Sequence, residues 1–136
     1  MQEGQESPQG RIRSKLLIVD DEEKVCQLLA HYFSLKEYEV RAVCTGEEAV
    51  ALAKIFHPHV VLLDLLMPGM NGIDTLRGLK KLRPAPMVLM LSAADHEQVV
   101  QGALGLGADL YVCKPPKLSH LEQLVNGFCP SPRSRH

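Results

Sequence analysis

Neither sign of charge predominates in this chain of 136 residues. Fifteen basic and sixteen acidic side chains leave a formal net charge of −1, which gives no electrostatic reason to expect nucleic-acid binding. A long apolar run is also lacking, because Asp64 interrupts the longest one before it approaches the roughly 20 residues of a membrane span. The polar start of the chain, with its Gly and Pro, is unlike a secretory signal. We therefore expect no direct contact with nucleic acid or membrane.

Cysteine pairs with the spacing of a zinc or redox motif are missing too. The four cysteines are Cys26, Cys44, Cys113 and Cys129. With 46 % hydrophobic residues the chain can form a core, and its length suits one domain. Reduced thiols in such a chain indicate a cytoplasmic protein. His57 and His59 flank Pro58 and could suggest a metal site, but a turn into the next strand is the favoured interpretation.

Strand and helix patterns alternate along the chain. Short, mostly apolar segments predict five strands, at 15–20, 38–43, 59–64, 87–92 and 109–114. The third and fourth are apolar on both faces, which is typical of central parallel strands. Helical stripes follow each strand, and their predicted inward positions include Val25, Leu28, Leu29 and Tyr32, then Ala49, Leu52, Ala53 and Phe56, then Val99, Ala103 and Leu106, then Leu121, Leu124, Val125 and Phe128.

Local signals mark several helix ends. Thr45 and Glu48 have the spacing of a capping box, and Asp95 can cap the fourth helix. The third helix is predicted over roughly 73–83, where the region of Pro84 ends it. The alternation predicts an α/β fold, a doubly wound five-stranded parallel sheet with five helices. A flavodoxin-like strand order of 2-1-3-4-5 suits this size, although periodicity alone does not determine the order.

Polar residues stand where the predicted strands end. Functional sites of open parallel sheets lie outside the carboxyl ends of the strands. Those ends carry Asp20, Asp21, Asp64, Ser92 and Lys114. Three carboxylates at one edge repel each other, and Lys114 together with a hard cation such as Mg²⁺ would offset their charge. Such an edge suits phosphoryl transfer, with a central carboxylate attacking phosphorus.

Each residue alone has an ordinary structural explanation. Asp20 and Asp21 could cap the first helix, Lys114 could be a solvated lysine, and Ser92 could lie in a turn. Their joint placement at the ends of the first, third, fourth and fifth predicted strands favours a functional site instead.

Four stretches, "LLIVDDE", "VVLLDLLMPGMNG", "VLMLSA" and "GADLYVCKP", occur in order over residues 15–128. With them the chain resembles the receiver domain of two-component response regulators. The resemblance implies a phosphoacceptor Asp64, phosphorylated by a histidine kinase or phosphotransfer protein, and Mg²⁺ held by Asp20, Asp21, Asp64 and the backbone carbonyl of Leu66. It also implies that Lys114 contacts the phosphoryl group and that the Lys114–Pro115 bond is cis.

The resemblance also implies a switch made of Ser92 and Tyr111. The Ser92 hydroxyl would bond a phosphate oxygen, and Tyr111 would rotate into the vacated space. The changed surface would lie on the fourth helix, fifth strand and fifth helix, where a downstream target or output domain would bind. A core role for Tyr111 is the competing interpretation. Beyond its own phosphorylation and dephosphorylation, no enzymatic activity is expected.

Three other functions fit the sequence less well. A Mg²⁺-dependent phosphatase of the haloacid-dehalogenase type needs a second Asp where this chain has Leu66. A flavin-binding module needs a Gly- and hydroxyl-rich loop where this chain has "DDEEK". A pseudo-receiver is disfavoured by the complete set of site residues.

The expected domain organisation is a mobile tail at 1–14, a receiver domain at 15–128, and a tail or start of a linker at 129–136. The segment after Phe128 is too short for an output domain. The chain is therefore either a regulator that acts by docking or the receiver portion of a longer transcriptional or enzymatic regulator.

Overall fold

A five-stranded parallel sheet organises the part of the chain that the computed structural model describes, residues 13–64, 72–92 and 97–129. The strands are β1 (Lys15–Val19), β2 (Glu39–Val43), β3 (Val60–Asp64), β4 (Met87–Ser92) and β5 (Leu110–Cys113). The helices are α1 (Glu23–Ser34), α2 (Gly46–Phe56), α3 (Gly72–Lys80), α4 (Glu97–Gly105) and α5 (Leu118–Phe128). The strand order is β2-β1-β3-β4-β5, so the predicted topology is confirmed.

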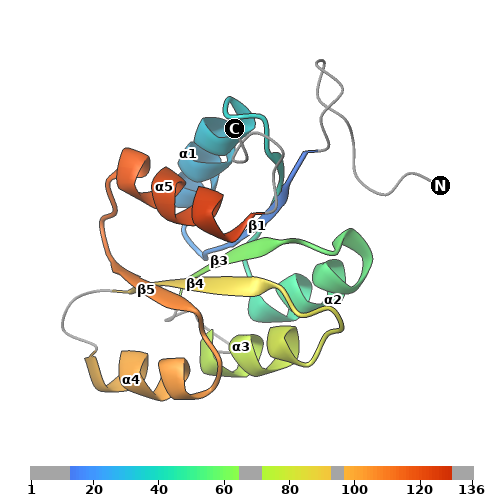
Figure 1. Cartoon of the computed structure of the whole chain (residues 1–136), viewed down its shortest axis with the longest axis vertical. Coiled ribbons are helices and arrows are strands. Elements are labelled where there is room, and N and C mark those ends of the chain that lie inside the picture. Colours follow the sequence, from blue (N-terminus) through green and yellow to red (C-terminus); the bar gives the residue numbers. More distant parts are fainter. Residues whose placement is uncertain (1–12, 65–71, 93–96, 130–136) are drawn as a thin grey trace.

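Helices cover both faces of the sheet, α1 and α5 on one and α2, α3 and α4 on the other (Figure 1). Successive strand residues point to opposite faces, so each strand supplies two hydrophobic cores. The α1/α5 core contains Leu16, Ile18, Cys26, Leu29, Phe33, Tyr38, Val60, Leu62, Leu89, Leu91, Val112, Leu121, Val125 and Cys129. The α2–α4 core contains Leu17, Val19, Ala49, Ala53, Val61, Leu63, Leu76, Leu79, Val88, Met90, Val100, Ala103 and Ala108.

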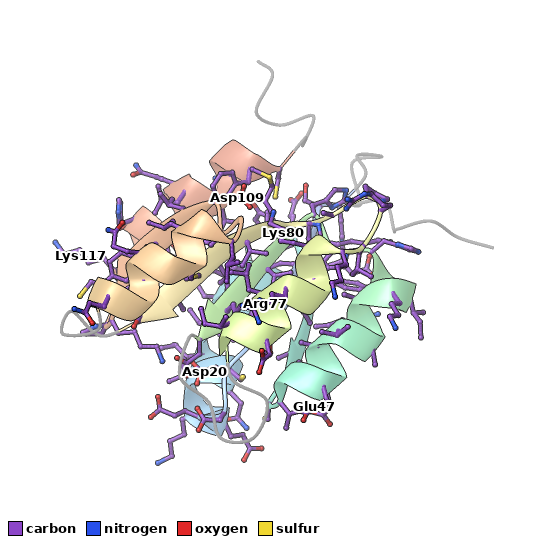
Figure 2. The ribbon with its side chains drawn as sticks, turned by 90° about the horizontal axis from the view of Figure 1, so that it is seen from below. Asp20, Glu47, Arg77, Lys80, Asp109 and Lys117 are labelled. Atoms are coloured by element: carbon purple, nitrogen blue, oxygen red, sulfur yellow. The ribbon has the colours of Figure 1, made fainter. Side chains whose placement is uncertain are left out.

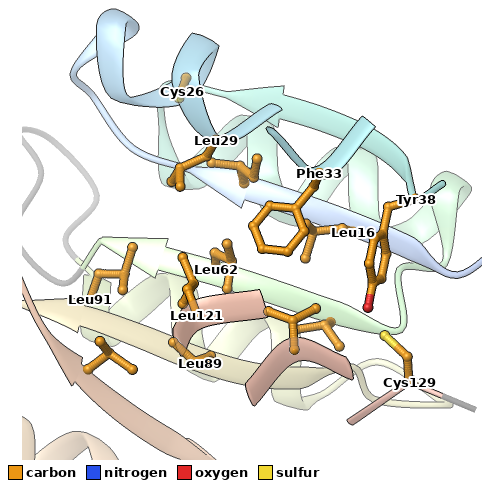
Figure 3. Packing of buried hydrophobic residues seen from close by; sticks show 14 residues of the cluster. Leu16, Cys26, Leu29, Phe33, Tyr38, Leu62, Leu89, Leu91, Leu121 and Cys129 are labelled. Carbon is orange, nitrogen blue, oxygen red and sulfur yellow. The ribbon is translucent and has the colours of Figure 1, made fainter. Parts of the chain in front are cut away.

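The buried face of α1 differs from the prediction. Cys26, Leu29 and Phe33 are buried, and Figure 3 shows Leu29 and Phe33 directed toward the sheet. Leu28, which was predicted to face inward, is 55 % exposed. The apolar residues of α1 cover a wide arc, and the part of that arc that faces the sheet contains Phe33 and not Leu28.

The predicted inward-facing stripe of α4 is wrong at its last position, Leu106. Ala103 is buried as predicted, but Leu106 is 41 % exposed. The helix ends at Gly105, and Gly107 with a φ of 109° turns the chain toward β5, so Leu106 does not continue the helical face. Asp95 and the side chain of Val99 lie outside the described residues.

The capping box at the start of α2 forms in a shifted version. The Thr45 hydroxyl accepts a hydrogen bond from the Glu48 N–H at 3.1 Å, as predicted. The Glu48 carboxylate accepts from the Cys44 N–H at 3.3 Å, one residue before the usual donor. Both bonds use groups that precede or open the helix, so they stabilise its first turn.

An ion pair and two hydrogen bonds connect α3, β4 and β5 at the amino-terminal edge of the sheet. Lys80 Nζ lies 2.7 Å from Asp109 Oδ2 and 2.8 Å from the Pro86 carbonyl. The same Asp109 oxygen accepts a 2.8 Å hydrogen bond from the Val88 N–H. Figure 2 shows Lys80 and Asp109 together and far from Asp20, which lies near the opposite edge. Within the described part of the chain, no helix has both the length and the apolar character needed to cross a bilayer.

Candidate functional site

Asp64 is the last residue of β3 and is only 6 % exposed. Its strand lies between β1 and β4, so its carboxylate emerges near the middle of the carboxyl edge of the sheet. Asp20 follows β1 directly and is 1 % exposed, whereas Asp21 is exposed. One carboxylate oxygen from each of these three residues lies within 4.8 Å of the others. The structure thus brings the three predicted acids together.

Lys114 joins this group from the end of β5. Its Nζ lies 3.1 Å from Asp20 Oδ2 and 3.4 Å from Asp64 Oδ2. Burial works to lower the pKa of Lys114, but the attraction of Asp64 and Asp20 outweighs it and raises the pKa above the ordinary lysine value. The ammonium therefore remains charged at neutral pH and offsets one of the clustered negative charges.

Two supporting residues were not predicted. The Glu22 carboxylate lies 3.9 Å from Lys114 Nζ, and its backbone N–H donates to Asp20 Oδ1 at 2.9 Å. The third acid in "DDEE" was the available signal for it. The buried Cys26 thiol donates to the Asp20 carbonyl at 3.1 Å and so holds the loop in place. Burial, followed by the nearby Asp20 charge, raises the pKa of Cys26 to about 11, so this thiol is not a nucleophile at neutral pH.

Ser92 and Tyr111 lie on the side of the sheet that α2, α3 and α4 cover. Ser92 ends β4 in a buried position, and its carbonyl accepts from the Lys114 N–H at 2.8 Å. Strand alternation puts Ser92 on the side of Met90, its neighbour in the α2–α4 core. Tyr111 is half-buried and packs against that same core. The structure therefore supports neither a fully exposed nor a fully enclosed Tyr111 ring.

Comparison with known proteins identifies this arrangement. The model of the response regulator receiver domain family matches residues 16–126. The chain belongs to this family. Its fold resembles a CheY-like receiver domain protein from Methanospirillum hungatei JF-1, with a TM-score of 0.80 and 26 % identity over 85 % of this chain and 92 % of that one. The receiver domain of Francisella response regulator 1452 has a TM-score of 0.78 and 29 % identity over 85 % and 96 % of the two chains.

Curated relatives of this receiver are longer than the chain. It is 36 % identical over 116 residues to the probable transcriptional regulator ycf27 of Cyanophora paradoxa, covering 85 % of this chain and 48 % of that protein. It is also 36 % identical over 110 residues to the DNA-binding response regulator MtrA of Mycolicibacterium smegmatis, covering 81 % and 48 %. The receiver spans about half the length of the curated relatives it matches.

The acidic cluster of the receiver fits a magnesium ion. Mg²⁺ binds oxygen ligands at about 2.1 Å, which puts its ligand oxygens roughly 3 to 4 Å apart. The carboxylate oxygens of Asp20, Asp21 and Asp64 lie within 4.8 Å of one another, so small side-chain rotations suffice. In the described residues this is the one group of three or more potential metal-ligating side chains. Leu66, whose carbonyl was predicted as a further ligand, lies outside the described residues.

The remaining sequence predictions have clear outcomes. The Lys114–Pro115 bond is cis, as the family resemblance implied. His57 has a left-handed φ of 55° at the end of α2, and His59 Nδ1 accepts a 2.9 Å hydrogen bond from the Lys15 N–H. These two histidines therefore form a turn into β3, and the turn interpretation is confirmed. The four cysteines all lie among the described residues and form no disulfide there.

Proposed function

We propose that this receiver is switched by phosphorylation of Asp64, with a sensor histidine kinase or a phosphotransfer protein as donor. The observation that carries the proposal is the nearly buried Asp64 carboxylate, which lies 3.4 Å from Lys114 and beside Asp20 and Asp21. A carboxylate that ends an apolar strand is costly to bury, and its neighbours are those that would stabilise a transferred phosphoryl group. With a donor of this kind, the proposed site of action is the cytoplasm.

In the proposed reaction, an Asp64 oxygen attacks the phosphorus of a phosphorylated histidine. The new oxygen–phosphorus bond forms as the phosphorus–nitrogen bond breaks, and the departing imidazole nitrogen keeps the electron pair. Lys114 neutralises charge on the transferred oxygens from a position already close to Asp64. Magnesium, held by Asp20, Asp21, Asp64 and the carbonyl of Leu66, would supply the remaining charge compensation.

The Asp64 assignment is tested by labelling with a small phosphodonor such as acetyl phosphate in the presence of Mg²⁺. Intact mass should rise by one phosphoryl group in the parent and stay unchanged in Asp64→Asn. Asp74→Asn is the matched control, because Asp74 is an exposed aspartate of α3 and its loss should leave labelling intact. Equal labelling of Asp64→Asn and the parent would refute the assignment.

The magnesium assignment has a separate test. Asp21 is exposed, so Asp21→Asn should fold normally, yet it removes one ligand charge from the cluster. Mg²⁺ should raise the thermal unfolding midpoint of the parent and have a much smaller effect on the variant, because ligand binding stabilises the folded state by mass action. An unchanged Mg²⁺ titration in Asp21→Asn would place the ion elsewhere.

We propose that the signal leaves the site through Ser92 and Tyr111. The backbone hydrogen bond between Lys114 and Ser92 links the ends of β4 and β5, and Tyr111 packs on the side of the sheet that α4 covers. The surface that responds would lie on α4, β5 and α5. Ser92→Ala should still be phosphorylated at Asp64 but should lose the phosphorylation-dependent amide shifts around Tyr111. A pattern identical to the parent's would exclude this route.

We also propose residues 15–128 as the receiver unit, with flanking segments at 1–14 and 129–136. As a second candidate function, this unit would regulate a DNA-binding output segment. The support is the half-length coverage of relatives such as MtrA, which is named a DNA-binding response regulator. Immunoblotting of the native protein would test the proposal, because a mass near that of this chain alone would contradict it.

A further inference from the structure

A concave site lies at the edge of the sheet opposite Asp64. This cleft has a volume of about 490 Å³, within the range of roughly 300 to 1,000 Å³ typical of small-molecule sites. It forms where chain segments enter β1, β3 and β4, and the segments leading into β3 and β4 lie on the right of Figure 1. Because the phosphoacceptor group occupies the carboxyl ends of the strands, the cleft is a separate place on the receiver.

The ionisable side chains that line the cleft are all basic. Its basic lining residues are Arg13, Lys15, Lys54, His57, His59 and Arg83, and the described lining contains no acidic residue. Near the cleft, Arg41 has an acidic partner, Glu39, at 3.4 Å, but neither residue lines the cleft. Two lysine and two arginine side chains around one concavity repel each other, and a bound anion would relieve that repulsion.

Two of these basic groups are held in place by the fold. Arg83 Nη1 donates to the carbonyls of Lys80 and Leu82 at 3.0 and 2.9 Å. Lys15 Nζ lies 5.5 Å from the centre of the Phe56 ring. These contacts position the cations before any ligand arrives, which lowers the entropic cost of binding.

Two hydrogen-bond donors at the cleft favour an anion as well. Arg13 Nε is buried without a hydrogen-bond partner among the residues that the structure describes. His59 Nδ1 accepts from the Lys15 N–H, so the neutral ring carries its proton on Nε2 and acts there as a donor. Burial, followed by the charge of Lys15, lowers the pKa of His59 and favours this neutral form.

The rest of the lining is apolar. Ala53, Leu82 and Phe128 contribute to it, together with prolines of the segments that enter β3 and β4. Inorganic phosphate alone would leave this apolar surface in contact with water. A ligand with a phosphate group and an organic body matches both parts of the lining.

We propose that this cleft binds a small organic phosphate of mononucleotide size. The phosphate would lie among the lysine and arginine side chains, which suit phosphate as fixed cations and as bidentate donors. The organic body would cover the apolar lining near Phe128. This site is independent of phosphorylation at Asp64.

Adenosine monophosphate is the probe, with adenosine and inorganic phosphate as comparison ligands. Titration of the whole chain in metal-free buffer containing EDTA should shift the amide resonances of Lys15, His59 and Ala85, and leave those around Asp64 unchanged. Adenosine monophosphate should bind more tightly than either comparison ligand, because only it carries both parts. Shifts confined to other regions, or equal affinity for adenosine, would overturn the proposal.

Charge reversal at the cleft provides the matched variants. Lys54 is an exposed residue of α2 that lines the cleft, and Lys54→Glu should weaken binding of adenosine monophosphate at least tenfold. Lys117→Glu makes the same charge change at an exposed lysine outside the cleft and should change affinity by less than about twofold. Equal losses of affinity in the two variants would show that only the net charge of the protein attracts the ligand, and would refute a specific binding site in the cleft. Phosphorylation of Asp64 should be the same in both, so this test can fail without affecting the proposed function.

Discussion

Removal of the Lys114 ammonium should lower the stability of the fold, and magnesium should restore most of the loss. In Lys114→Met the side chain keeps nearly its length but loses its charge, and Asp20 and Asp64 then face each other without a cation. The two ion pairs, at 3.1 and 3.4 Å, are each worth about 5 kcal/mol before desolvation is counted, at an effective dielectric constant of about 20. Desolvation cancels much of this gain.

The net loss of unfolding free energy in Lys114→Met comes from the Asp20 and Asp64 carboxylates, which stay buried after their cation is removed. Leaving buried charges unpaired typically costs about 3 to 5 kcal/mol, and the lower end applies because the Lys114 side chain is still 23 % exposed. With a urea m value of about 2 kcal/mol/M, a loss of about 3 kcal/mol lowers the unfolding midpoint by about 1.5 M. Since the pKa of Lys114 is raised, this contribution is complete at pH 7 and is lost only as pH rises through that pKa.

The assay is urea unfolding at pH 7 in EDTA and then in excess Mg²⁺, with Lys117→Met as the control at an exposed lysine. Magnesium should restore most of the lost stability of Lys114→Met, and so should a second substitution, Asp64→Asn, which removes one of the facing charges. A midpoint in EDTA within 0.3 M of the parent, a shift expected for changes below about 0.6 kcal/mol, would refute the reasoning. So would a double variant no more stable than Lys114→Met.

Three smaller predictions concern the rest of the fold. The pKa of His59 is lowered in the folded state, so the free energy of unfolding should fall as pH drops from 7 toward 5. The variant His59→Asn keeps an acceptor for the Lys15 N–H and should flatten this pH dependence in urea titrations. Asp109→Ala leaves the buried Val88 N–H without its acceptor and should cost about 2 kcal/mol in the same assay. Thr45→Ala removes the α2 cap and should cost about 1 kcal/mol, and a loss below the error of the measurement would contradict the capping role.

The strands and the acidic site were predictable because their signals are local. The apolar segments before Asp20 and Asp64 end in carboxylates, and parallel strands end at one edge, so the sequence alone leads to the cluster. The strand order needed one more assumption, that a chain of this size adopts the common arrangement, and the sheet confirms it.

Helix faces were less predictable where apolar residues are abundant. The predicted stripe of α1 included Leu28 and omitted Phe33, whereas packing against the sheet buries Phe33 and leaves Leu28 exposed. Leu106 fits the period of α4 but lies after its last residue, in a turn that depends on the backbone of Gly107. Periodicity describes one element at a time, whereas both outcomes depend on the next element.

The cleft could not be predicted for a different reason. Lys15 and His59 are 44 residues apart, and Arg83 is farther still along the chain. Nothing in local spacing indicates that these side chains meet. The cation cluster follows from the topology, which brings the amino ends of three strands together.

The alternation of the two cores has a consequence for insertions and deletions. In β3, Val60 and Leu62 enter the α1/α5 core, and Val61 and Leu63 enter the α2–α4 core. Loss or gain of one residue here would exchange these sets and carry Asp64 to the opposite face, away from Asp20 and Lys114. Length changes within 60–64 should therefore abolish the site even where the fold survives, because the position of Asp64 depends on the number of residues that precede it in the strand.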